Sequence, residues 1–451
     1  MKSEKIPSYR IIELSSIQDF GISVISHAIY ILTLFPCNPP RVSFPLPREG
    51  LGVGLLMLLQ ISTSALAEAL TAVSKAMSAK NPIAILDDAL LSCENGKYYI
   101  TGGSTDASLR MPIEVNLMKG NFEPIMLPLN LLNSSLALMP DVPVVFDVTT
   151  VADGYSVKCE YQGKGEQKGR FSFTTQSGKD YPQPVVPEEV KVSFVTTPAN
   201  LLAPLTAAAD FTHKKLDSSP MYNVAICVNC EGYDVVATDG HKLYRYTHQA
   251  GVGFATGEGV AVSPDGKLEH HDILILPQVV GAITHAFRKE ENICVTANDQ
   301  KIIFSANGIR LTLSAREGKY PNYNGVIPKA NQYSVTLNRK ETMEALKRVN
   351  VFASVTTNLV ILSANGLLIN IAGQDVDYSR ASSEDICVIN TNLPSGYKIG
   401  LNVQMLMRLV ANITTENVRL ILDDPTRPVL IKDDDDNANV TMLTMPMFVE
   451  N

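Results

Sequence analysis

Tryptophan is absent from the 451 residues, and positive charge is in the minority. The chain has 38 Lys and Arg against 46 Asp and Glu, which gives a formal net charge of −8. A protein whose whole surface binds phosphates is usually strongly basic, so the sequence excludes that class but not a local basic surface. No uncharged apolar run reaches the roughly eighteen residues of a membrane-spanning helix. The length of 451 residues is enough for about three domains, and the 45% hydrophobic content supports large buried cores.

Cysteines are few and scattered, and only Cys227 and Cys230 form a CxxC pair. The other five are Cys37, Cys93, Cys159, Cys294 and Cys387. An odd, dispersed set in a large chain is typical of reduced thiols in the cytoplasm rather than of a disulfide scaffold. Because a single CxxC in a strand-like run lacks the second ligand pair of a zinc site, we expect no metal there.

Sequence motifs of catalysis and cation binding are also missing. No GxxxxGK[ST] loop is present, so we expect no ATP hydrolysis and no cofactor. His270, His271 and Asp272 have no companion carboxylate at metal-ligand spacing. The acidic run at 433–436 lacks the glycine and terminal glutamate of a calcium loop, and we interpret it as a solvated hairpin tip.

The first 56 residues differ in character from the rest. Residues 20–36 are apolar and follow three basic residues, which resembles a signal or anchor segment, but His27 interrupts the run. A Pro- and Gly-rich stretch without helical or strand period follows, and at Met57 the pattern changes to a strand and then a helix. We expect translation to start at Met57, with residues 1–56 an upstream extension. A real tail or anchor is the alternative.

Three segments share a strand, a helix cap and an amphipathic helix. They lie at residues 59–70, 192–205 and 333–346. Ser62, Thr197 and Asn338 stand eight residues before the last leucine of each segment, and their side-chain oxygens are suited to capping a helix. Pro198 then takes the first helical position, where a missing N–H is tolerated. This self-similarity predicts a threefold internal repeat.

Each repeat has a second half with the same logic, a short apolar strand followed by Pro or Asn and a helix. These second strands lie at 125–128, 274–277 and 399–402, and alternating stretches typical of hairpins follow each helix. We therefore predict an α+β fold of three domains, each a doubled β-α-βββ unit with its helices on one side of antiparallel sheets. The predicted parts are the non-conforming extension 1–56 and domains at 57–183, 190–328 and 332–451.

Three motifs in the second and third repeats carry a family resemblance. They are VATDGHKL at 236–243, GKYPNYNGVIP at 318–328 and TMPM at 444–447. Together with the threefold repeat, they resemble the bacterial DNA polymerase III β subunit, the sliding clamp. The resemblance implies that the three repeats are DNA-clamp domains, and that two copies close head to tail into a homodimeric ring around duplex DNA. It implies a non-catalytic cytoplasmic processivity factor whose partners are the replicative polymerase, the clamp loader and other clamp-binding proteins.

The resemblance also implies a hydrophobic groove for partner peptides. The residues it assigns to this groove are Tyr222, Thr238, Gly240, His241, Lys242, Leu243, Pro321, Tyr323, Val326, Leu443, Met445, Pro446 and Met447. Asp239-Gly240 is by itself a strong hairpin-turn signal. We align Asp106 of the first repeat with Asp239, so that the aspartate recurs while Gly-His does not. Lys242 stands where arginine is common in the family, which puts any forked contact there in doubt.

Basic residues on the predicted helices are candidates for sequence-independent phosphate contacts. They are Lys75, Lys80, Lys214, Lys215, Arg288, Lys289, Arg339, Lys340, Lys347, Arg348 and Arg408, with Lys80 the strongest because it matches a basic family position. For any single residue, a solvated surface charge is the alternative. The regions of Phe171, Phe173, Val351 and Phe352 meet across the dimer interface in the family, with an intradomain core position as the alternative.

Two rival functions are open at this point. An enzyme could use Asp239 and His241 as general acid and base, which predicts a pocket and loss of turnover on substitution of His241. A clamp-like scaffold of a phage or mobile element with restricted partners is the second rival. The terminal methionines weigh toward a binding surface, because methionine suits sites that accept several partners.

Overall fold

The computed structural model describes residues 55–77, 81–163, 167–184, 189–214, 219–260, 270–435 and 438–449. Residues 1–54 lie outside the described residues. The apolar run at 20–36 and most of the predicted upstream extension fall in this segment. The first strand begins at Leu55, two residues before the boundary predicted at Met57. Among the helices of the described residues, none has the length and apolar character needed to cross a membrane.

Where it is described, the first repeat contains nine strands and two α-helices, with η marking 3₁₀ helices. Its elements are β1 (Leu55–Ser62), α1 (Thr63–Ser74), η1 (Ala84–Asp87), β2 (Ala89–Glu94), β3 (Lys97–Gly103), β4 (Ala107–Ile113), β5 (Val115–Gly120), β6 (Ile125–Leu127), α2 (Leu129–Leu136), β7 (Pro143–Val151), β8 (Gly154–Gln162), β9 (Lys168–Thr175) and η2 (Gly178–Asp180). The additional strand β5 pairs with β1 and so connects the two halves of the repeat.

The second and third repeats follow the same order without a separate fifth strand. The second consists of β10 (Val192–Thr196), α3 (Pro198–Ala209), η3 (Pro220–Tyr222), β11 (Val224–Asn229), β12 (Gly232–Thr238), β13 (Lys242–Gln249), η4 (Glu258–Val260), β14 (His271–Ile275), α4 (Pro277–Phe287), β15 (Ile293–Ala297), β16 (Lys301–Ala306), β17 (Ile309–Ser314) and η5 (Tyr323–Gly325). The third consists of β18 (Tyr333–Asn338), α5 (Arg339–Asn350), β19 (Leu359–Asn365), β20 (Leu368–Asp375), β21 (Arg380–Thr391), β22 (Lys398–Asn402), α6 (Val403–Ala411), β23 (Asn417–Leu422), β24 (Val429–Asp433) and β25 (Val440–Thr444).

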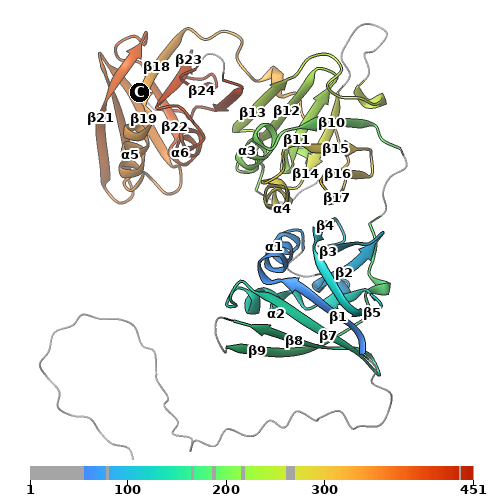
Figure 1. The fold of residues 1–451 in the computed structure, drawn as a ribbon. Helices are drawn as coiled ribbons and strands as arrows, with labels where there is room; N and C mark the ends of the chain where they lie inside the picture. The colour runs from blue at the N-terminus through green and yellow to red at the C-terminus, as the bar shows by residue number, and fades with distance from the viewer. Residues whose placement is uncertain are drawn as a thin grey trace, which may run out of the picture. The chain divides into compact units, whose positions relative to one another are not determined.

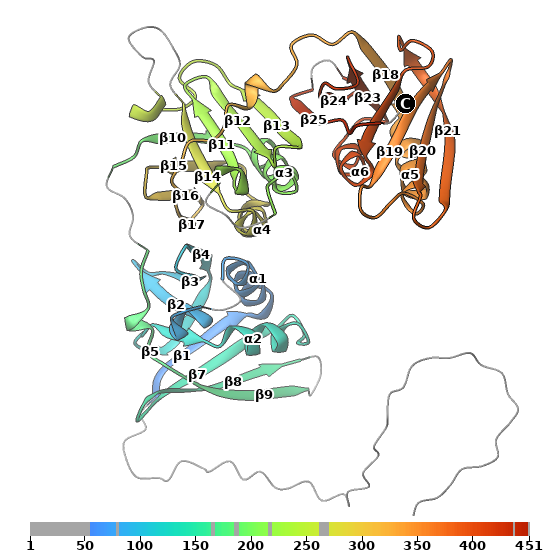
Figure 2. The ribbon, with the colours of Figure 1, turned by 180° about the vertical axis from the view of Figure 1, so that it is seen from behind.

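The described strands form three antiparallel sheets, and two of these sheets join neighbouring repeats. Their orders are β5-β1-β7-β8-β9, β10-β15-β16-β17-β4-β3-β2-β6 and β14-β11-β12-β13-β25-β24-β23-β18-β21-β20-β19-β22. The pairing of β4 with β17 joins repeats one and two, and the pairing of β13 with β25 joins repeats two and three. In each repeat the two helices pack against each other and against the sheets (Figures 1 and 2). The predicted doubled β-α-βββ unit is confirmed.

The predicted helix starts follow from their caps. Ser62 accepts a hydrogen bond from the Ala65 amide, and Asn338 accepts one from the Glu341 amide. Asn402 caps α6 in the same way. Thr197 occupies the N-cap of α3 but makes no side-chain cap bond, so Pro198 at the first helical position defines that start. The helices present their apolar faces, including Leu66, to a core shared with both sheets of each repeat.

One sequence interpretation of this part of the chain is wrong. Asp433, expected in a solvated tip, is 5% exposed. Its Oδ1 accepts hydrogen bonds from the Thr414 and Thr415 amides, so it ties the end of α6 to β24. Asp434 forms an ion pair with Arg419 at 2.7 Å. The first two carboxylates of the run are therefore structural, which a run of four like residues does not reveal.

Candidate functional site

The turn between β12 and β13 is built by its own side chains. Oδ1 of Asp239 accepts hydrogen bonds from the His241 and Lys242 amides, both at 2.9 Å. The Thr238 hydroxyl accepts from the Gly240 amide at 3.1 Å and donates to the Lys242 carbonyl at 2.7 Å. Gly240 has φ +86°, which favours glycine at this position. Asp239 thus shapes the turn, and these bonds give it no contact with the His241 imidazole of the kind that an acid–base pair requires.

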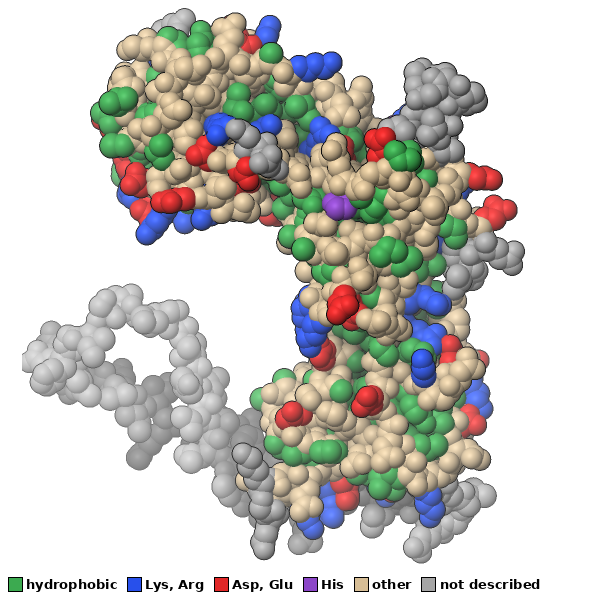
Figure 3. All heavy atoms as spheres, turned by 45° about the horizontal axis from the view of Figure 1, so that its top comes forward, with side chains coloured by type: hydrophobic (Ala, Val, Ile, Leu, Met, Phe, Trp, Pro, Cys, Tyr) green, Lys and Arg blue, Asp and Glu red, His purple; other side chains and the backbone are tan. Residues whose placement is uncertain are grey.

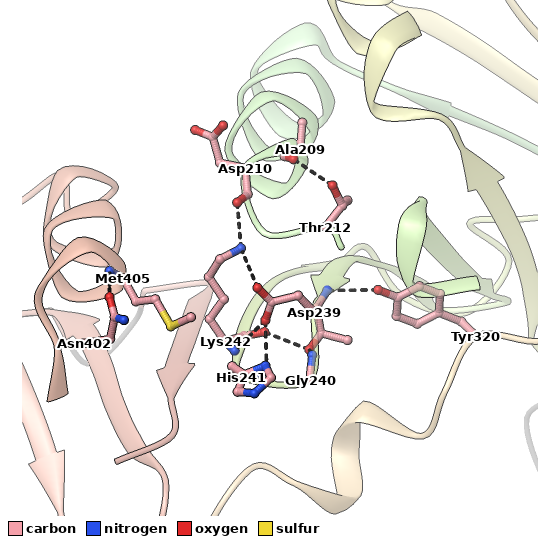
Figure 4. Close-up of polar contacts among 11 residues, drawn as sticks. Ala209, Asp210, Thr212, Asp239, Gly240, His241, Lys242, Tyr320, Asn402 and Met405 are labelled. Atoms are coloured by element: carbon pink, nitrogen blue, oxygen red, sulfur yellow. Dashed lines mark hydrogen bonds and ion pairs between the residues drawn. The ribbon is translucent and has the colours of Figure 1, made fainter. Parts of the chain in front are cut away.

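The Lys242 side chain does not face the surface. It is 3% exposed, and its Nζ donates to the Asp210 carbonyl at the end of α3 at 2.7 Å. The same ammonium lies 3.3 Å from the Asp239 carboxylate and 5.0 Å from the centre of the Phe211 ring. Burial lowers the pKa of Lys242, and the nearby Asp239 partly opposes this shift. The Lys242 side chain therefore connects the turn to the end of α3. His241 projects away from that ammonium (Figure 4). The Lys242 side chain was predicted to contact a peptide in the groove, but the structure buries it instead.

Residues 318–327, which we call the strap, lie over the outer face of the β11–β14 sheet. The Tyr320 ring is 5% exposed, and its hydroxyl accepts a hydrogen bond from the Thr238 amide at 3.0 Å. The Tyr320 amide donates to Asp272 at 2.9 Å, and the Tyr323 hydroxyl donates to Asp234 at 2.7 Å. Val326, near the end of the strap, is 51% exposed.

A small apolar cluster lies beneath the strap and spans the join between repeats two and three. Its buried members are Ala225, Cys227, Val236, Leu243, Leu274, Tyr320, Leu430 and Leu443. Leu243 of β13 and Leu443 of β25 are direct partners in the strand register. Desolvation raises the pKa of the Cys227 thiol well above its usual range, which makes it an unreactive core residue. The cluster gives the predicted groove an apolar floor.

The C-terminal segment after β25 is held by two backbone hydrogen bonds. The Met445 amide donates to the His241 carbonyl, and the Met447 amide donates to the Gly400 carbonyl of β22, both at 2.8 Å. Pro446 has no N–H and stands between the two donors, where none is needed. Met445 is 38% exposed. The segment thereby spans from the turn of repeat two to the sheet edge of repeat three.

Most of the predicted groove residues therefore meet at one join. His241, Pro321, Val326 and Met445 are exposed there, over the buried Leu243 and Leu443. Tyr222 is 9% exposed in η3 and its hydroxyl accepts a hydrogen bond from Gln278, so it is buried at the edge of this region. Sequence reasoning missed two residues that organise the site, Tyr320 and Gly400. The repeated GKYP and GKDYP motifs carried a signal for Tyr320, whereas Gly400 carried none.

Some of the predicted DNA-facing residues lie outside the described part of the chain, and others are paired with carboxylates. Lys80 and Lys215 lie outside the described residues, and Lys214 follows α3 rather than lying on it. Arg288 and Lys289, at the end of α4, both contact Glu68 of α1, at 3.0 Å and 2.6 Å. Arg348 is bound by both carboxylate oxygens of Glu384 on β21, at 2.8 Å and 2.7 Å.

The remaining cations sit at helix ends. Lys75 is the C-cap of α1, Arg339 and Lys340 begin α5, Lys347 lies in its last turn and Arg408 lies in the last turn of α6. No ion pair within the described part of the chain engages any of these five. On the face drawn in Figure 3, basic and acidic side chains are interspersed rather than gathered in one block.

The residues predicted for a dimer interface lie on two different edges. Phe171 and Phe173 are half-buried on β9, the outer strand of the five-stranded sheet, and pack on the core. Val351 and Phe352 follow α5 and are 70% and 41% exposed. The first pair is therefore partly a core pair, and the second pair is a surface pair.

Comparison with known proteins agrees with this geometry. Residues 324–448 match the sequence profile of the DNA polymerase III beta subunit, C-terminal domain. A beta sliding clamp of Synechocystis sp. is 25% identical over 405 residues, covering 88% of this chain and 100% of the relative. One of Pseudomonas aeruginosa is 23% identical over 391 residues, covering 86% and 99%.

Solved structures give the same answer for the fold. A sliding clamp from Pseudomonas aeruginosa, solved bound to griselimycin, has a TM-score of 0.75 at 20% identity and covers 88% of this chain and 100% of its own. A DNA polymerase III β subunit from Thermotoga maritima has a TM-score of 0.74 at 19% identity, with 87% and 100% covered.

Three doubled α+β repeats joined edge to edge, with an apolar site at the second join, have the fold of the solved DNA clamps. The predicted fold class is confirmed. The chain resembles the bacterial DNA polymerase III β subunits, the β sliding clamps, along most of its length. Its function is that of a DNA sliding clamp in replication, a non-catalytic processivity factor, and its partners in general terms are DNA, a DNA polymerase and a second copy of itself.

Proposed function

We propose that two copies of this chain close into a ring through β9 of one copy and β21 of the other. The observation that carries this proposal is a shared rule at the two internal joins. In each, the last strand of a first half (β4 or β13) pairs with the last strand of the next repeat (β17 or β25). The strands left over by this rule are β21 and β9.

Both leftover strands have an edge available for pairing. Within the described residues, β9 pairs only with β8. The first part of β21 pairs on one side with β20, and only its last residues, from Val388 to Thr391, reach β18 on the other side. Joining them would repeat the internal joins a third time and leave neither edge open, which protects against aggregation.

Duplex DNA would pass through such a ring and touch the helices without sequence preference. Lys75, Lys340 and Lys347 are the best placed of the predicted cations, because they are exposed and no described carboxylate pairs with them. Weak, distributed phosphate contacts permit sliding, since each is screened by salt and none fixes a register. We place the protein in the cytoplasm, with the replicated DNA.

The groove at the second join would bind a short peptide of the replicative polymerase, the clamp loader or another partner. Its exposed Met445 and Val326 supply apolar surface over the buried leucine pair, and methionine adapts to different peptides. A ring held on DNA raises the effective concentration of a bound polymerase at the primer end. Several partners would then compete for one groove on each copy.

The experiment that tests ring closure compares circular with linear DNA. Labelled protein is loaded onto nicked circular DNA with a clamp loader, separated by gel filtration, and the DNA is then cut once. A ring stays with the circle and leaves the linear form. Equal retention on both forms would show binding without encirclement, and a monomer by light scattering at micromolar concentration would count against ring closure.

A further inference from the structure

The join between repeats one and two is built like the join that carries the groove. In the turn before β13, the Asp239 amide donates to the Lys242 carbonyl at 3.4 Å. In the turn before β4, the Ser104 amide donates to the Ala107 carbonyl at 2.6 Å. Ser104, and not Asp106, therefore occupies the place of Asp239, so the sequence alignment of the two aspartates is wrong.

The equivalence extends across both joins but changes chemistry at the floor. Leu243 pairs with Leu443 in the groove, one position inside the Lys242 pair. At the first join the equivalent pair, one position inside Ala107, is Ser108 with Thr312. The leucine pair beneath the groove is thus replaced by two hydroxyl side chains.

The tyrosine of the GKYP and GKDYP motifs also differs between the joins, because only at the first join does its hydroxyl lack a partner among the described residues. Tyr320 uses its hydroxyl to accept the Thr238 amide. Its counterpart, Tyr181, is 4% exposed in a small cluster with Leu86, and its hydroxyl has no partner in the described part of the chain. Burial raises the pKa of Tyr181 to about 12, so the group keeps its proton and can donate.

All three residues contribute to the lining of one cavity of about 310 Å³ at this join, which we call the first-join cavity. Ser108 Oγ, Tyr181 Oη and Thr312 Oγ1 are buried and have no hydrogen-bond partner among the described residues. Thr312 is 3% exposed. Unpartnered buried polar groups are rare and costly, so three in one cavity indicate a ligand that satisfies them.

The lining of the cavity carries one charge of each sign, and the cation is the less exposed of the two. Its lining includes one basic side chain, Lys301, which is half-buried and donates to Ser314 at 3.1 Å, and one acidic side chain, Asp106, which is exposed. Water screens the exposed carboxylate more than the half-buried ammonium. Ile83, Pro182 and Pro184 add apolar walls at the mouth, which suits an extended peptide rather than a free ion.

We propose that the first-join cavity is a second docking site, which receives the carboxylate of an acidic side chain on an extended partner peptide. The hydroxyls of Ser108, Tyr181 and Thr312 would each donate to the carboxylate oxygens, which accept several hydrogen bonds and donate none. Lys301 supplies the opposite charge. The site is distinct from the groove at the second join and does not depend on it.

The test uses the full-length protein with methyl-labelled isoleucine, threonine and methionine, observed by NMR. The probe is N-acetyl-glutamate amide, and N-acetyl-glutamine amide is its neutral, isosteric control. We expect saturable shifts of the Ile83 and Thr312 methyls with the glutamate probe and no shift of Met445 in the groove. The glutamine probe should bind at least about tenfold more weakly, since hydrogen bonds to a charged acceptor are roughly twice as strong.

Thr312→Val removes one hydroxyl at constant shape and should weaken the glutamate probe about tenfold, with Ile83 as the reporter. The thermal midpoint should stay unchanged or rise, because a buried group without a protein partner is lost. Thr71→Val, at an exposed threonine of α1, is the matched control and should bind the probe normally. No saturable shift, equal binding of both probes, or full binding by Thr312→Val would each overturn the proposal and leave a merely hydrated polar cavity.

Discussion

Gly400→Ala should detach the C-terminal segment from β22 and thereby weaken peptide binding at a groove that the substitution does not touch. A Cβ at this position would lie 2.5 Å from a Val449 methyl and 2.8 Å from the Met447 carbonyl oxygen. It would also lie 3.0 Å from a Leu359 methyl. The backbone oxygen cannot give way without straining the bond that the Met447 amide donates to Gly400.

The size of the effect follows from those contacts. Overpacking by one carbon typically costs about 1–3 kcal/mol, and loss of one backbone hydrogen bond costs about 0.5–1.5 kcal/mol. The lower ends of these two ranges add to about 1.5 kcal/mol. This already shifts the equilibrium between the docked and the detached segment about tenfold, because about 1.4 kcal/mol corresponds to a factor of ten. Since Met445 and Pro446 belong to the same segment, the apparent peptide affinity should fall by a similar factor.

Fluorescence anisotropy with a labelled peptide from the cognate replicative polymerase measures this change. Light scattering and the thermal midpoint check that the ring and the fold survive. Gly281→Ala in α4 is the matched control, because a Cβ there has no heavy atom within 4 Å. If Gly400→Ala binds the peptide within about twofold of the control, the segment does not form the groove in the way we describe.

Three other substitutions test separate parts of the structure. Glu68→Gln should free its two basic partners and raise the salt concentration at which the loaded ring leaves circular DNA; an unchanged midpoint would show that they do not face DNA. Phe352→Asp should give monomers by light scattering while Leu138→Asp, at an equally apolar but unrelated exposed site, stays dimeric. Lys242→Met should lower the free energy of unfolding by about 1–3 kcal/mol, because Asp239 loses a buried donor. As burial lowers the pKa of Lys242, that free energy in the wild type should rise with pH up to the ordinary lysine pKa of about 10.4, and the difference between the two proteins, measured by denaturation, should show that rise.

The local elements of the fold could be predicted because their causes are local. Ser62 and Asn338 cap their helices through bonds to residues three positions away. Alternating apolar residues likewise defined the hairpins, and repetition defined the order of halves. Thr197 shows the limit of such predictions. It is the N-cap residue of α3 as predicted, but its side chain makes no cap bond, and Pro198 defines the start of the helix.

The site could be predicted only as a set of motifs, because its geometry depends on distant partners. Glu68 and Arg288 are 220 positions apart in the chain, so no sequence pattern shows that a candidate DNA contact is already paired. The motif assigned Lys242 to the groove, yet its ammonium donates to the carbonyl of Asp210 at the end of α3. Asp106 was matched to Asp239 by residue type, whereas the hydrogen-bond register matches Ser104.

The strands at the two joins between repeats pair through main-chain hydrogen bonds, and the side chains at the two joins differ. Arg110 and Arg310 even face each other across the first seam, and Glu94 holds Arg110 with both carboxylate oxygens. Strand pairing of this kind tolerates substitution, since every residue except proline supplies the same amide and carbonyl. Whole repeats should therefore be interchangeable between distant relatives, with the circumference of the ring preserved. The side chains at each join, leucines at one and hydroxyl residues at the other, can then change independently.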